Sequence, residues 1–107
     1  MSSYSMQTLQ LIEAVRRLLL NDDLFLPPTQ KQLVKMNIQI AEAIDDDTMN
    51  SKVKKALRIR VLRLLTGLPI ASSKQLTRKE CSTIIDLTNE GEANEQLREI
   101  AKTAIEA

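Results

Sequence analysis

Apolar residues recur every three or four positions along most of the chain, the spacing that predicts amphipathic helices. Polar, glycine or proline residues interrupt this pattern at four places. The pattern therefore predicts five helices, at about residues 5–20, 29–45, 51–66, 77–90 and 92–105. We expect an all-α fold, a small helical bundle in which residues 1–107 form a single domain.

The first two segments each carry one apolar stripe. In the first segment the stripe consists of Met6, Leu9, Ile12, Val15 and Leu19, widened by Leu18. In the second, the residues expected to face inward are Leu33, Val34, Met36, Ile40, Ala41 and Ile44. Thr29, followed by Gln32, predicts a capping box at the start of the second helix.

Two prolines separate these helices and exclude a continuous one. The residues before them, Leu24, Phe25 and Leu26, are all apolar. Because the residue before a proline favours extended backbone, we expect residues 24–28 to form an apolar strap across the bundle.

The third helix, at about 51–66, is apolar on two sides. One stripe consists of Val53, Leu57, Val61 and Leu64. Ile59 and Leu62 lie on nearly the opposite side, so this is either the central helix of the bundle or a helix whose second face meets another subunit. The second alternative makes Ile59 and Leu62 candidates for self-association, most simply as a two-fold dimer. Gly67 is expected to end the helix in the left-handed conformation.

The fourth helix has the clearest start signal in the chain. Thr77 and Glu80 form a capping box, and Leu76 can pack against Cys81 as a hydrophobic staple. We expect Gly91 to end this helix. The fifth helix spaces its apolar residues as one narrow seam, which consists of Ala93, Leu97, Ile100, Ala101, Ala104 and Ile105.

The composition supports a folded, aliphatic protein. The 107 residues include 30 Ile, Leu and Val, but Tyr4 and Phe25 are the only aromatic residues. A single cysteine allows no internal disulfide. The sequence shows no apolar run that could span a bilayer and no secretory leader pattern, so we expect a cytoplasmic protein.

Catalytic chemistry has little support in this sequence. The chain has no histidine, so it has no His-based triad and no imidazole metal ligand. Cys81 lacks the usual base, and a core role suits it better. The acidic run at residues 45–47 lacks the glycine and distal glutamate of a calcium-binding loop, and capping of the third helix explains it. We therefore expect no enzyme, no cofactor and no metal.

Charge is distributed unevenly along the chain. Residues 48–79 hold nine of the fifteen basic residues and no acid, so the formal charges of the three blocks run −3, +9 and −5 and sum to +1. Such a block indicates an anionic partner, which can be a nucleic-acid backbone, another protein or the acidic ends of this chain. The candidate nucleic-acid-binding residues are Lys52, Lys55, Arg58, Arg63, Lys74, Arg78 and Lys79.

Three of these candidates, Lys74, Arg78 and Lys79, cluster at the start of the fourth helix, where the helix dipole disfavours cations. Together with free backbone N–H groups they describe a possible phosphate cradle, although Glu80 neutralises part of it. The basic block has no aromatic residue on which bases could stack, so any nucleic acid would be held by its backbone.

The segment IASSKQLTRKECSTIID, residues 70–86, resembles a short pattern in accessory proteins of phage and plasmid DNA recombination. The pattern is a helix start with a serine-lysine stretch, then Leu-Thr, a charged pair and a helix that carries Ile-Ile or Leu-Ile before an aspartate. This resemblance implies a role in DNA metabolism or in a mobile element.

Two functions remain open at this level. The first is a helical protein-interaction or adaptor module that associates with itself, and the second is a protein that contacts the nucleic-acid backbone through block 48–79.

Overall fold

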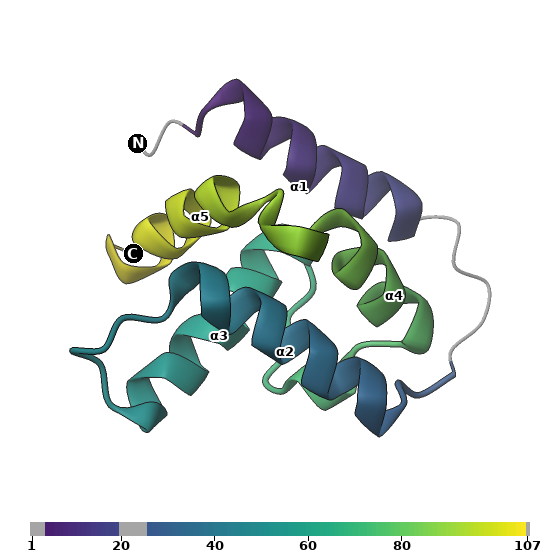
Figure 1. Ribbon diagram of the computed structural model, residues 1–107. Coiled ribbons are helices and arrows are strands. Elements are labelled where there is room, and N and C mark those ends of the chain that lie inside the picture. The colour runs from purple at the N-terminus through teal and green to yellow at the C-terminus, as the bar shows by residue number, and fades with distance from the viewer. Residues whose placement is uncertain (1–3, 20–25, 107) are drawn as a thin grey trace.

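The computed structural model describes residues 4–19 and 26–106, apart from the side chains of Glu90 and Glu106. The α-helices are α1 (Met6–Leu19), α2 (Gln30–Ile44), α3 (Ser51–Thr66), α4 (Arg78–Leu87) and α5 (Asn94–Glu106), with short 3₁₀ helices η1 (Ser73–Gln75) and η2 (Asn89–Gly91) (Figure 1). No strand occurs within these ranges. The predicted all-α bundle of five helices is confirmed.

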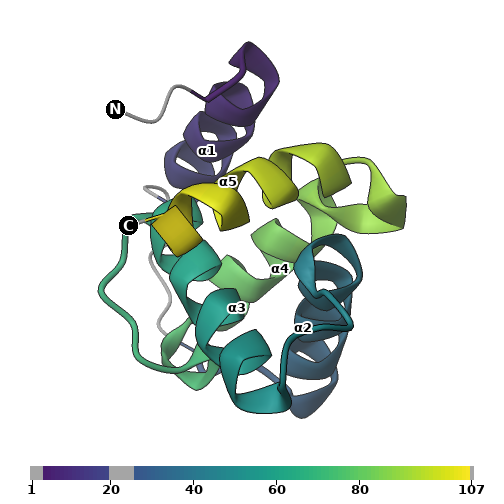
Figure 2. The same ribbon diagram turned by 90° about the vertical axis from the view of Figure 1, so that its left-hand side faces the viewer.

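The helices form three layers. Helix α1 packs against α3, α4 and α5, and helix α2 packs against the same three helices from the other side (Figures 1 and 2). Helix α3, which was predicted to be central, contacts α1, α2 and α5. The molecule measures 37 × 30 × 26 Å, and each α-helix carries solvent-exposed residues.

Local capping signals place the helix ends where they were predicted. Both capping boxes are present, at Thr29 with Gln32 and at Thr77 with Glu80. Gly67 ends α3 with a φ of 74°, and its N–H donates to the Arg63 carbonyl at 2.8 Å. Leu76 and Cys81 are both buried, as the staple requires.

Two predicted helix ends are corrected. The side chain of Asn50, not that of an acidic residue, caps α3 by accepting a hydrogen bond from the Val53 N–H at 2.9 Å. Helix α4 ends at Leu87, before Gly91, because the chain turns into η2. Gly91 closes that 3₁₀ turn with a φ of 77°.

Most of both apolar stripes of α3 is covered by the same chain, but Val53, which was predicted in the first stripe, is 47% exposed. Leu57 belongs to the first stripe and Leu62 to the second, and they are 4% and 0% exposed. Ile59 is half-buried and packs against the core. The predicted self-association through Ile59 and Leu62 is therefore wrong for Leu62, which has no surface to offer. The alternative of a central helix accounts for the buried residues of both stripes.

Two other helices bury a face that differs from the predicted one. In α1, Thr8 and Val15 are fully buried, whereas Met6 and Leu9 are exposed. In α2, Val34 was expected inside but is exposed, together with its neighbour one turn on, Ile38. In both helices the neighbouring elements decide which of several apolar sides is covered.

The strap predicted at residues 24–28 is described only in part, since Leu24 and Phe25 lie outside the described residues. Leu26 is exposed, and its carbonyl accepts a hydrogen bond from the Arg78 N–H at 2.8 Å. The Pro27 carbonyl accepts a second bond from Arg78 Nε at 3.3 Å. The described part of the segment is therefore tied to the first turn of α4.

Candidate functional site

Every arginine of the chain donates to an acceptor within the protein. The pairs are Arg16 with the Leu64 carbonyl, Arg17 with Glu13, Arg58 with Asp45, Arg60 with the Ala104 carbonyl, Arg63 with the Ile70 carbonyl, Arg78 with the Pro27 carbonyl and Arg98 with the Ala43 carbonyl. Five of these bonds join segments that are at least 13 residues apart, whereas those of Arg17 and Arg63 are local. The five give their arginines a structural role.

Several of these bonds cap the C-terminus of another helix. Arg16 of α1 reaches the last turn of α3, and Arg98 of α5 reaches the last turn of α2, at 2.7 and 2.8 Å. Arg60 of α3 lies 3.4 Å from the Ala104 carbonyl in α5. The last carbonyls of a helix have no intrahelical partner and carry partial negative charge, so a cation is favoured there.

The lysines behave differently. Across residues 4–19 and 26–106, no ion pair or hydrogen bond involves a lysine ammonium group. This holds for the four lysines among the candidate nucleic-acid-binding residues, Lys52, Lys55, Lys74 and Lys79, all of which are exposed. The other three candidates, Arg58, Arg63 and Arg78, have the internal acceptors given above. The seven residues thus divide into free lysines and engaged arginines.

The backbone part of the predicted phosphate cradle is largely occupied. At the start of α4, the Arg78 N–H donates to the Leu26 carbonyl, and the Glu80 N–H donates to Thr77 Oγ1 at 3.1 Å. Glu80 in turn accepts from the Thr77 N–H at 2.6 Å. The start of α4 therefore offers cations from Lys74 and Lys79 but few open N–H groups.

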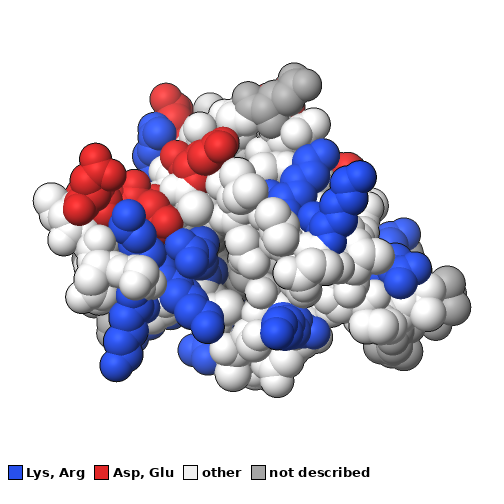
Figure 3. Space-filling view, turned by 60° about the horizontal axis from the view of Figure 1, so that its bottom comes forward, with Lys and Arg blue, Asp and Glu red and all other residues white. Residues whose placement is uncertain are grey.

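Figure 3 shows how charge is arranged on one face of the molecule. Basic side chains appear there as separate groups with uncharged surface between them, and acidic side chains gather at one side. The basic side chains on this face do not form one continuous patch.

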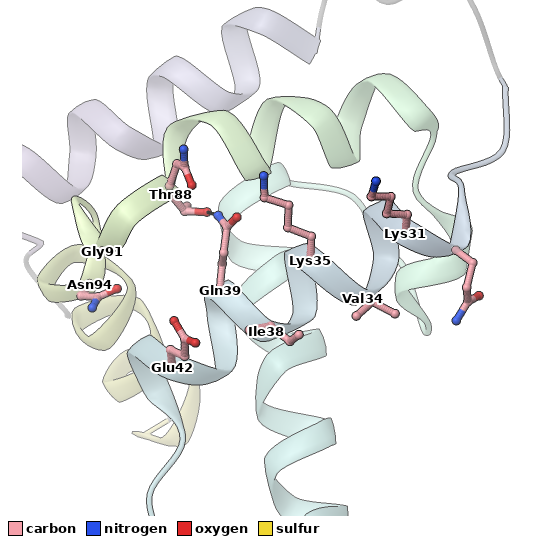
Figure 4. A pocket seen from close by; sticks show the side chains of 11 residues that line it. Lys31, Val34, Lys35, Ile38, Gln39, Glu42, Thr88, Gly91 and Asn94 are labelled. Atoms are coloured by element: carbon pink, nitrogen blue, oxygen red, sulfur yellow. Dashed lines mark hydrogen bonds between the residues drawn. The ribbon is translucent and has the colours of Figure 1, made fainter.

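A groove of about 770 Å³ runs along the outer side of α2. Its α2 side includes Val34 and Ile38, which are 47% and 51% exposed. The opposite wall belongs to η2, with Asn89 and Gly91, and to the first residue of α5, Asn94. The groove therefore exposes apolar surface between a helix and a turn (Figure 4).

Charged side chains flank this apolar surface. Lys31 and Lys35 lie toward the start of α2, and Glu42 lies toward its end. None of the three takes part in an ion pair within the described parts of the chain. The rim is basic at one end and acidic at the other.

Gln39 fixes one wall of the groove to the other. Its Nε2 donates to the Ile85 carbonyl at 3.0 Å and to Thr88 Oγ1 at 2.9 Å, as Figure 4 shows for Thr88. Thr88 Oγ1 itself donates to the Ile84 carbonyl at 2.7 Å. Because Gln39 thereby caps the last turn of α4, the groove is bounded by elements that are bonded to each other.

The sequence contained a signal for this surface that was not recognised. Val34 and Ile38 are four residues apart and therefore share a side of α2, away from Leu33, Met36 and Ile40. The apolar spacing predicts Val34 in the core and places Ile38 on neither face. Exposure of the pair depends on the absence of a neighbouring helix there, which the spacing of residues does not reveal.

The thiol of Cys81 and the carboxylates of Asp45 and Asp46 lie in environments that suit a role in the fold. Burial, and then the nearby charge of Glu80, raises the pKa of the Cys81 thiol to about 11, so it is protonated at neutral pH. Asp45 pairs with Arg58 at 2.8 Å. Asp46 accepts hydrogen bonds from the Thr48 N–H and hydroxyl, which lower the pKa of Asp46.

Within the described residues, no three or more His, Cys, Asp or Glu side chains are grouped as a metal site. No helix in these ranges has the length and apolar character needed to cross a bilayer.

Comparison with known proteins found no family model, no curated protein and no solved structure that matches the chain. The resemblance of residues 70–86 to recombination accessory proteins stays a prediction.

Proposed function

We propose that the protein is a helical interaction or adaptor module that binds a helix of another protein chain in the groove along α2. The observation that carries this proposal is the exposure of Val34 and Ile38 beside a groove whose walls are fixed to each other. Helix-in-groove recognition uses apolar anchors at such spacings. It also uses charges at the rim, which fix the direction of the bound helix.

A selection of helical peptides for binding to the full chain tests this function. We expect the selected peptides to bind wild-type protein and to lose at least tenfold in affinity for Val34→Asp and Ile38→Asp, because a charge would have to be buried against an apolar partner. The matched control is Val53→Asp. Val53 lies on α3 outside the groove and is 47% exposed, as Val34 is.

Peptides that bind all three variants equally would contradict the proposed surface. A failure to fold is separated from a loss of binding by circular dichroism, since each substituted side chain is about half exposed. All three variants should keep the helical signal of the wild type.

A second candidate function is contact with a nucleic-acid backbone. It is supported by the free ammonium groups of Lys52, Lys55, Lys74 and Lys79, which are available to phosphates. The resemblance of residues 70–86 would place either function in DNA metabolism or a mobile element.

A further inference from the structure

The charges on the outer side of α2 oppose the helix dipole. Lys31 is in the first turn and Glu42 is in the last, whereas anions are favoured at the first position and cations at the second. Neither has an ion-pair partner in the described parts of the chain. Arg98 supplies a cation at the C-terminal end through its bond to the Ala43 carbonyl, but no acidic residue lies in the first turn of α2 to balance Lys31.

The same arrangement is complementary to itself. At 100° per residue, Lys31, Lys35, Ile38 and Glu42 lie within about 60° of one another on the outer side of α2. An antiparallel copy of this helix reverses their order. Its acidic end then meets the basic end of the first helix, and its apolar centre meets the apolar centre.

We infer that the groove along α2 is occupied by a second copy of this chain, related by a two-fold axis that passes near the middle of α2. This inference rests on the proposed function of the groove as a docking surface. Two antiparallel α2 helices bring Lys31 of each copy to Glu42 of the other. The aliphatic stem of Lys35 covers Ile38 of the second copy.

The two-fold geometry explains why Lys31 and Glu42, each at the helix end that disfavours its charge, lie on one face of α2. Each Lys31–Glu42 pair places a carboxylate beside the N-terminus of one helix and an ammonium group beside the C-terminus of the other, which is the favoured arrangement at both ends. A two-fold contact is made by the same patch twice, so it requires a self-complementary surface. The outer side of α2 is such a surface.

The contact should be weak. Val34 and Ile38 are already about half covered in the single chain, so each copy has little apolar area left to bury. Interfaces of this size belong to the weak class, and we expect a dimer dissociation constant on the order of 10–100 µM.

Sedimentation equilibrium of the full chain, at protein concentrations from about 5 to 500 µM, measures this association over the range where it should be half complete. Wild-type protein and Val53→Asp should dimerise equally. Val34→Asp and Ile38→Asp should raise the dissociation constant at least tenfold, because each change places two charges in the interface.

Charge reversal tests the antiparallel pairing itself. Lys31→Glu alone or Glu42→Lys alone places like charges together twice per dimer and should raise the dissociation constant about tenfold. The double variant Lys31→Glu/Glu42→Lys restores opposite charges across the axis, and its dissociation constant should return to near the wild-type value. Each reversal also suits the dipole of α2, so folding is not endangered.

A wild-type chain that remains monomeric at 500 µM would contradict the inference that a second copy occupies the groove. So would a double variant that is weaker than either single one. Neither result affects the peptide selection, in which Val34→Asp and Ile38→Asp test the groove for a different occupant. Equal binding of the selected peptides to all variants would instead refute the docking groove itself.

Discussion

At the level of single residues, arginine and lysine have different roles in this protein. Each arginine donates to an internal acceptor, as Arg16 and Arg98 do to helix ends. The guanidinium group carries five donors in a planar fork, so one side chain can bond a carbonyl and still be partly hydrated. Counting both residue types as one basic block therefore overstates the charge that is free to bind a partner.

Glu99 shows what a single acidic residue contributes. Its carboxylate accepts hydrogen bonds from the Thr8 hydroxyl at 2.8 Å and from the Ser5 N–H, at the N-terminal end of α1. These bonds, that from Thr8 first, lower the pKa of Glu99 below its ordinary 4.5. A carboxylate with a lowered pKa stabilises the fold above its unfolded pKa, and this stabilisation is lost as the pH falls through the folded value.

We expect Glu99→Gln to remove this acid dependence. The melting temperature of the wild type should fall more steeply than that of the variant as the pH is lowered below about 4.5, while the two should differ by a constant amount above about pH 6. Glu95→Gln is the control, because Glu95 lies on the same helix, is exposed and has no hydrogen bond from its side chain. Parallel acid transitions for all three proteins would contradict the proposed role of Glu99.

At the level of helices, the ends of elements hold the bundle together. The last turns of α2, α3, α4 and α5 are each bonded by a side chain from another helix, namely Arg98, Arg16, Gln39 and Arg60. Each bond satisfies a carbonyl that the helix itself leaves open. The helices therefore depend on one another at their ends as well as in the core.

Arg98→Ala tests this coupling. Loss of the bond to the Ala43 carbonyl should lower the free energy of unfolding by about 1 kcal/mol, measured by urea denaturation. Arg98→Lys should recover only part of it, because an ammonium group lacks the fork geometry. Lys102→Ala, one turn further along α5, should change the free energy by less than about 0.5 kcal/mol. An equal effect of the two alanine variants would mean that the cap contributes nothing.

How far each element could be predicted depends on whether its signal is local. The helix starts at Thr29 and Thr77 and the stop at Gly67 were predicted correctly, since a cap is made by residues within one turn of it. The buried faces were less predictable. Leu62 and Val34 are both apolar, yet Leu62 is in the core and Val34 is exposed. Helix α3 has α1 and α2 on opposite sides, whereas the helices that contact α2 leave its outer side open.

At the level of the whole molecule, a net charge of +1 conceals two separate charged surfaces. One is the rim of the α2 groove, which carries both basic and acidic side chains. The other consists of the free lysines of block 48–79, which the two-fold contact through α2 leaves exposed. Since the caps that link the helices use no lysine, the lysines can be changed without loss of the fold.

The lysines of block 48–79 make the second candidate function testable. If phosphates bind there, replacing both Lys52 and Lys55 by Gln should weaken binding to all duplex DNA sequences alike. It should also reduce the slope of log affinity against log salt by up to about two, since each phosphate contact contributes about 0.9. Fluorescence anisotropy between about 50 and 200 mM salt measures both quantities. The melting temperature should not change, because neither ammonium group has an internal partner.

The matched control replaces Lys31 and Lys35 by Gln, which removes the same charge from α2 instead of α3. Contacts with phosphate depend on position, so this pair should leave the salt slope unchanged. An equal loss of DNA affinity in the two double variants would mean that binding depends only on the net charge of the protein. An affinity that neither pair changes would remove Lys52 and Lys55 from consideration as a nucleic-acid surface, and these two lysines would then serve only to keep the exposed side of α3 hydrated.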